Sequence, residues 1–78
     1  RIVRNALIAA GNSGDTAYVP AITALLADGS PLVRAMAVWA LARLAPADAF
    51  DALKAHHASA EPDPDVRLEW TFTETGPK

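Results

Sequence analysis

Two short clusters hold the side chains that could do chemistry, a histidine pair and a group of aspartates around a proline. His56 and His57 are adjacent, so on a helix they point in different directions, and the usual zinc-ligand spacings are absent. Asp63 and Asp65 flank Pro64, and paired carboxylates can act as general acid and base. An acidic turn that caps the following helix explains them better. We therefore predict neither a metal site nor catalytic residues in this chain.

The chain contains no cysteine among its 78 residues. It can form no disulfide, no thiolate metal site and no cysteine nucleophile, and this composition is typical of a cytoplasmic protein. No glycine-rich phosphate or dinucleotide motif occurs. No apolar run approaches the roughly 20 residues that a membrane span needs. These features favour a binding role, without a membrane partner, over an active site.

The main pattern is an internal repeat marked by the dipeptide Val-Arg. It occurs as Val3-Arg4, Val33-Arg34 and Val66-Arg67, at nearly equal spacings along the chain. Each copy opens an apolar helical stretch, and acidic turns with proline precede the second and third copies, at 28–31 and 61–65. A helix pair that recurs at such a period is typical of stacked helical repeats. We predict an all-α fold, a HEAT-like α-α superhelix of about five helices.

The predicted helices form a half repeat over 1–14, a repeat over 15–45 and a weaker repeat over 46–75. In the full repeat, Asp15 can cap the first helix and Ser30 the second. We expect the helices at about 2–10, between 15 and 28, and at 31–44, 47–57 and 65–72. The threonines near the end are poor helix formers, so the last helix is expected to stop near residue 72.

The first repeat lacks its first helix, which indicates a piece of a longer protein. Its remaining helix would leave an apolar face on Ile2, Ala6, Leu7 and Ala10 without a partner. Exposed apolar faces promote association. We therefore expect that the chain self-associates through this truncated repeat or is only marginally stable.

Arg4, Arg34 and Arg67 recur at one position of the repeat, and two interpretations are open. The arginines can form a ladder that grips phosphates along one edge of the stack. Alternatively, each can pair with an acidic residue or a backbone carbonyl of a neighbouring turn, for which the natural partners are Asp15, Asp28 and Asp65. We favour the structural interpretation for Arg34 and Arg67, whereas for Arg4 the two are balanced.

Asparagine near the start of the chain offers a further nucleic-acid contact. Asn5 lies beside Arg1 and Arg4 in the first helical turns, where its amide can bind RNA. Asn12 stands between Gly11 and Gly14 and is better explained by a left-handed turn. The candidate nucleic-acid-binding residues are therefore Arg1, Arg4, Asn5, Arg34 and Arg67.

Trp39 lies one helical turn before Arg43, so the guanidinium can cover the indole face on one side of a helix. A tryptophan shielded in this way is a packing residue. We prefer this interpretation to a platform on which a base stacks.

Two segments, 4–15 and 31–44, resemble the C-terminal HEAT-like domain of epoxyqueuosine reductase. The resemblance is carried by Arg4-Asn5, by the turn Gly-Asn-Ser-Gly-Asp at 11–15, and by Trp39-Ala40 after Val33-Arg34. Ala35 and Ala42 stand where that family often has glycine. The resemblance implies an iron–sulfur protein of tRNA queuosine biosynthesis.

The resemblance also implies a division of labour within the parent protein, an oxidoreductase. Cobalamin and two [4Fe–4S] clusters would belong to a catalytic domain upstream, because clusters need thiolate ligands that this chain lacks. This domain would hold no cofactor and would help to bind tRNA. The alternative is a generic HEAT-like protein-interaction or scaffold module, and the net charge of −2 weighs mildly toward it.

Overall fold

The computed structural model of the chain describes the backbone of residues 2–75 and the side chains of residues 5–71. Its α-helices are α1 (Ile2–Ser13), α2 (Val19–Ala24), α3 (Pro31–Leu44), α4 (Ala47–His57) and α5 (Pro64–Thr75), and single 3-10 turns at Thr16–Tyr18 and Leu25–Ala27 flank α2. The predicted all-α fold is confirmed, and residues 2–75 contain no strand. No helix in this part of the chain is long and apolar enough to cross a membrane.

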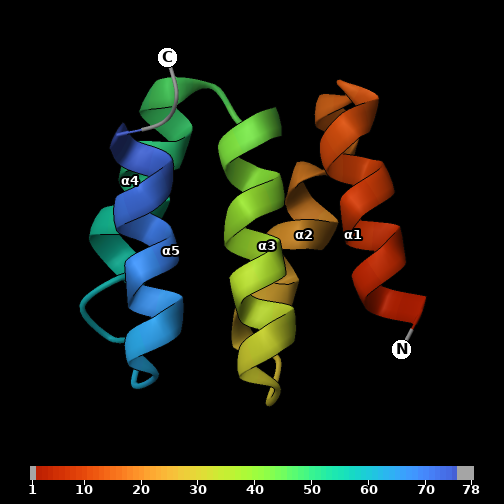
Figure 1. Cartoon of the computed structure of the whole chain (residues 1–78). Helices are drawn as coiled ribbons and strands as arrows, with labels where there is room; N and C mark the ends of the chain where they lie inside the picture. Colours follow the sequence, from red (N-terminus) through yellow and green to blue (C-terminus); the bar gives the residue numbers. More distant parts are fainter. Residues whose placement is uncertain (1, 76–78) are drawn as a thin grey trace.

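Helix α3 lies at the centre of the molecule (Figure 1). Helices α1 and α5 flank it, α2 lies behind the gap between α1 and α3, and α4 lies behind α5. Four residues of α3 are completely buried: Ala37, Val38, Ala40 and Leu41. A helix with neighbours on several sides must be apolar on several sides, which explains why Arg34 and Arg43 are its only charged residues.

Helix α3 begins as the sequence predicts. The Ser30 hydroxyl accepts a hydrogen bond from the backbone N–H of Val33 at 3.4 Å, and Pro31 occupies the first helical position. Proline suits that position because its missing N–H would have no partner within the helix.

The helix expected after Asp15 is divided into three short segments. The Asp15 carboxylate accepts the N–H of Ala17 at 2.9 Å, which confirms it as a cap. The N–H of Tyr18 then donates to the carbonyl of Asp15, closing a 3-10 turn. Pro20 has no N–H to donate to a preceding carbonyl, so regular α-helical bonding starts only within α2.

Helix α1 continues beyond its predicted end, as far as Ser13. Asn12 lies inside it, so the predicted left-handed turn at Asn12 is wrong. The left-handed conformation belongs to Gly14, with φ of 75°. Gly11 also lies inside the helix, and a Cβ atom built there would be 2.6 Å from Cζ3 of Trp39 and 3.3 Å from Cα of Ala40. The missing side chain therefore lets α1 approach α3 closely.

Helix α5 starts at Pro64 and ends at Thr75, slightly earlier and slightly later than predicted. Its start is fixed by Asp63, whose carboxylate accepts the N–H groups of Asp65 at 2.8 Å and Val66 at 3.3 Å. Trp70 is buried against Phe50, with ring centroids 5.3 Å apart. Packing of this kind outweighs the weak helix propensity of the threonines.

We predict that Gly11→Ala lowers the free energy of unfolding by about 1–2 kcal/mol. Overpacking costs about 1–3 kcal/mol, and a Cβ atom 2.6 Å from the indole ring places this substitution in the upper half of that range. The better helix propensity of alanine returns about 1 kcal/mol. Gly29→Ala is the matched control, because a Cβ atom there meets nothing within 4 Å. Urea denaturation checks both variants, and a Gly11→Ala protein as stable as the wild type would disprove the close approach.

Candidate functional site

Arg34 joins α3 to the turn before α5. Its Nε donates to Oε1 of Glu61 at 2.9 Å and to Oε2 at 3.2 Å, and its Nη2 donates to Oε2 at 2.9 Å. Its Nη1 donates to the backbone carbonyl of Asp28 at 2.7 Å. One guanidinium thus binds the turn before its own helix and the carboxylate of the next turn, in the two-pronged geometry that suits arginine.

The Glu61 carboxylate is buried, with 8% of the residue exposed, and the Arg34 side chain is 13% exposed. Oε2 of Glu61 also accepts the backbone N–H of Asp63 at 3.0 Å. The hydrogen bond with Glu61 raises the pKa of Arg34 above its ordinary value, so the guanidinium stays charged. Every buried polar side-chain atom among the described residues has a partner.

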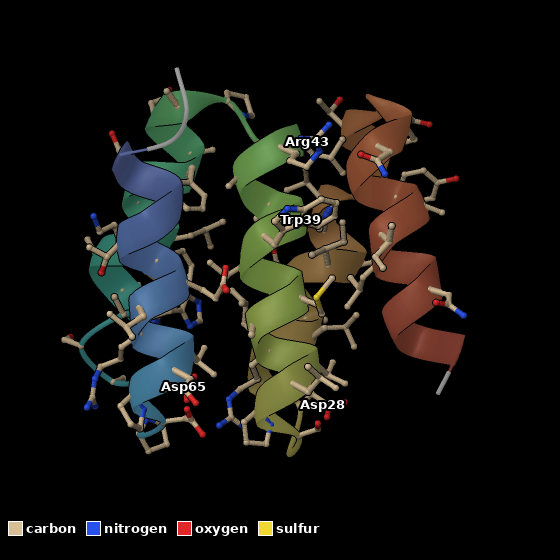
Figure 2. The ribbon with its side chains drawn as sticks, viewed as in Figure 1. Asp28, Trp39, Arg43 and Asp65 are labelled. Atoms are coloured by element: carbon tan, nitrogen blue, oxygen red, sulfur yellow. The ribbon has the colours of Figure 1, made fainter. Side chains whose placement is uncertain are left out.

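The turn before α5 repeats the geometry of the turn before α3. Nη1 of Arg67 donates to the backbone carbonyl of Glu61 at 2.7 Å, as Arg34 does to Asp28. The Asp28 carboxylate accepts the N–H of Ser30 at 2.8 Å, and Glu61 receives the N–H of Asp63 in the same way. Glu61 is thus the counterpart of Asp28 in the next repeat. Figure 2 shows Asp28 and Asp65 at the same end of the stack.

The described candidate nucleic-acid residues lie on three different helices rather than in one cluster. Asn5 is exposed on α1, Arg34 is half-buried on α3 and Arg67 is exposed on α5. Arg1 lies outside the described residues, as does the side chain of Arg4. Nucleic-acid binding by these five residues stays a prediction.

Arg34 and Arg67 both bind a backbone carbonyl of a neighbouring turn, as the structural interpretation expects. The acidic side chain that pairs with Arg34 is not one of the expected aspartates. The three predicted acidic partners, Asp15, Asp28 and Asp65, pair with neither arginine through their carboxylates; Asp28 contributes its carbonyl alone. The partner of Arg34 is Glu61. The sequence holds a signal for it, because Glu61 follows Asp28 at the same spacing at which Arg67 follows Arg34.

At the other end of α3, Arg43 covers Trp39 as predicted. The guanidinium carbon lies 5.3 Å from the indole centroid, and its Nε donates to the carbonyl of Gly11 at 3.3 Å. Figure 2 shows both side chains on the side of α3 that faces α1. The indole is therefore enclosed between α1 and the guanidinium, which matches a packing residue.

The histidine pair is divided between two environments. The His57 ring is parallel to the Trp70 indole, with centroids 6.4 Å apart, whereas His56 meets His57 edge-on and is exposed. His57, Trp70, Arg34 and Glu61 line one cavity of about 250 Å³. The described residues contain no group of three side chains that could hold a metal ion.

His57 should make stability depend on pH. Burial, and then the charge of His56, lower the pKa of His57 below 6.5. As the pH falls, the unfolded chain therefore takes up this proton before the folded chain does. The contribution of His57 is complete above about pH 6.5 and is lost below it.

We predict that His57→Gln loses less stability than the wild type between about pH 7.5 and pH 5.5, as measured by chemical denaturation. His56→Gln is the control, and its pH dependence of stability should stay closer to that of the wild type. It removes the charge of His56, which is the weaker of the two causes that lower the pKa of His57. Equal pH dependence in the wild type and in His57→Gln would contradict this assignment.

The comparisons with known proteins agree with this geometry. A family model described as HEAT repeats matches residues 2–71, nearly the whole chain. No curated protein and no solved structure gives a match. HEAT repeats are a non-catalytic type of helical repeat, in agreement with the prediction that this chain carries no catalytic residues. The helices stack on a central α3, and an arginine at a fixed position of the repeat joins them. Together with this match, the arrangement shows that the chain belongs to the HEAT-repeat family.

Proposed function

We propose that this HEAT-repeat chain is a domain of an epoxyqueuosine-reductase-like protein of the cytoplasm and that it contributes to tRNA binding. Family membership by itself suggests a protein-interaction or scaffold module. The finer proposal is supported by the residues at 4–15 and 31–44 that resemble the C-terminal domain of that enzyme. In the structure these two segments form most of α1 and all of α3, which pack against each other.

The RNA contact is assigned to the start of α1, with Arg1, Arg4 and Asn5. The observation that carries this choice is the exposed Asn5 amide, which makes no hydrogen bond with any described residue. Arginine beside asparagine can bind a phosphate and a neighbouring sugar or base edge. Arg34 and Arg67 have a smaller part in this proposal, because each guanidinium donates a hydrogen bond to the turn before its own helix.

The cofactors that the resemblance implies do not fit these residues. Iron–sulfur clusters need thiolate ligands, and the sequence has no cysteine. The described residues offer no group of metal ligands in their place. We therefore assign cobalamin and both clusters to an upstream catalytic domain of the same polypeptide, with which this domain would pack.

The second candidate function is a protein-interaction module without RNA. It is favoured by the charge of the chain, because the net charge of −2 repels a polyanion. It is also favoured by Arg34, whose positive charge is neutralised internally by Glu61. The salt dependence of binding separates the two functions, since phosphate contacts weaken steeply with salt.

We predict that Arg4→Glu weakens tRNA binding by the polypeptide that contains this chain by about tenfold and reduces the salt slope by at least about 1. Asn5→Ala should weaken binding several-fold and leave the slope unchanged, because it removes no charge. The matched control is Asn12→Ala, an exposed asparagine at the other end of the same helix. Filter binding over a salt series measures all three, and unchanged affinity of Arg4→Glu at matched salt would reject the RNA contact.

A further inference from the structure

Arg67 repeats Arg34 with one of its two binding partners: it binds the backbone carbonyl of its own turn but no carboxylate of a described residue. Arg34 uses Nη1 for the carbonyl of its own turn and both Nε and Nη2 for the Glu61 carboxylate. Arg67 uses Nη1 for the carbonyl of Glu61 at 2.7 Å. Arg67 forms no ion pair with the described residues, so its Nε and Nη2 meet no carboxylate there. The corresponding contacts of Arg34 thus show which partner the exposed Arg67 guanidinium lacks, namely a carboxylate.

The helix surface beside Arg67 continues the same pattern. Leu68 is 49% exposed and Thr71 is exposed. Their counterparts in the preceding repeat are Ala35 and Val38, on the helix against which α5 packs; Ala35 is half-buried and Val38 is completely buried. Helix α5 therefore presents to solvent the surface that α3 uses to hold the next repeat.

We propose that the α5 face formed by Arg67, Leu68 and Thr71 binds an acidic turn of a partner polypeptide. The partner would carry a glutamate or aspartate, then a serine or aspartate cap two residues later, and a proline that opens a helix. Its carboxylate would bind Nε and Nη2 of Arg67, and its helix would lie along α5. The proposal is independent of the tRNA contact at α1.

A carboxylate suits this position better than a nucleic-acid backbone. The existing pair with Glu61 shows that the surroundings of the repeat arginine accept one planar carboxylate. The half-exposed Leu68 adds an apolar contact that suits a packed helix.

The test uses a synthetic peptide with the sequence of residues 58–71, which contains such an acidic turn and the helix after it. In ¹⁵N-labelled protein, the Arg67 Nε–H resonance should move on titration toward the position of the Arg34 Nε–H resonance. A second peptide with glutamine in place of Glu61 should bind about tenfold more weakly, because it loses a charge-assisted pair. Arg67→Gln should abolish the difference between the two peptides, and Arg43→Gln, the control, should preserve it.

Two results would overturn the proposal. One is equal affinity for the glutamate and glutamine peptides, or no binding of either, while the Arg34 Nε–H resonance keeps its paired position and so reports a folded protein. The other is a shift of the Arg67 resonance by a short oligouridylate but not by the peptide, which would assign this face to RNA.

Discussion

The stack depends on one buried ion pair, between Arg34 and Glu61. A buried carboxylate is costly unless it is paired and fully hydrogen-bonded, and Glu61 receives the guanidinium of Arg34 and the N–H of Asp63. Asp63 in turn caps α5. The pair therefore fixes both the contact between repeats and the residue at which α5 begins. Because an arginine fork accepts a carboxylate in one plane, it also fixes the orientation of the turn.

The two ends of α3 are held by different interactions. At the start of the helix, polar contacts of Arg34 connect it to the turn before α5. Toward its end, Trp39 fits against Gly11 of α1, and Arg43 closes over the indole. The contacts of Arg34 fix the orientation of the turn relative to α3, because hydrogen bonds have preferred angles. The contact between Trp39 and Gly11 supplies close packing, because glycine lets two helix backbones approach. Together they place α1 and α5 on opposite sides of α3, as the paired segments of a repeat stack require.

Local features of the sequence are sufficient to predict most helix boundaries. Ser30 with Pro31, Asp15 and the aspartates around Pro64 mark helix starts through contacts that span only a few residues. The predictions differ from the structure where a distant contact decides. Gly11 resembles part of a turn in the sequence, because its partner Trp39 belongs to another helix. The pairing of Glu61 with Arg34 also joins distant parts of the chain, and helical periodicity does not report such pairs. Only the correspondence between the two acidic turns, at 28–31 and 61–64, points to it.

A double-mutant cycle on Arg34 and Glu61 tests the ion pair most directly, with midpoints of thermal unfolding as the measurement. Arg34→Met and Glu61→Gln should each lower the midpoint, and the double variant should lose less than the sum of the two, because neither partner is then left unpaired. Arg67→Met with Glu61→Gln is the matched control. Arg67 binds the backbone carbonyl of Glu61 and not its carboxylate, so these two effects should add. Additive losses for Arg34 and Glu61 as well would contradict the account, since the repeats would then be held together without this pair.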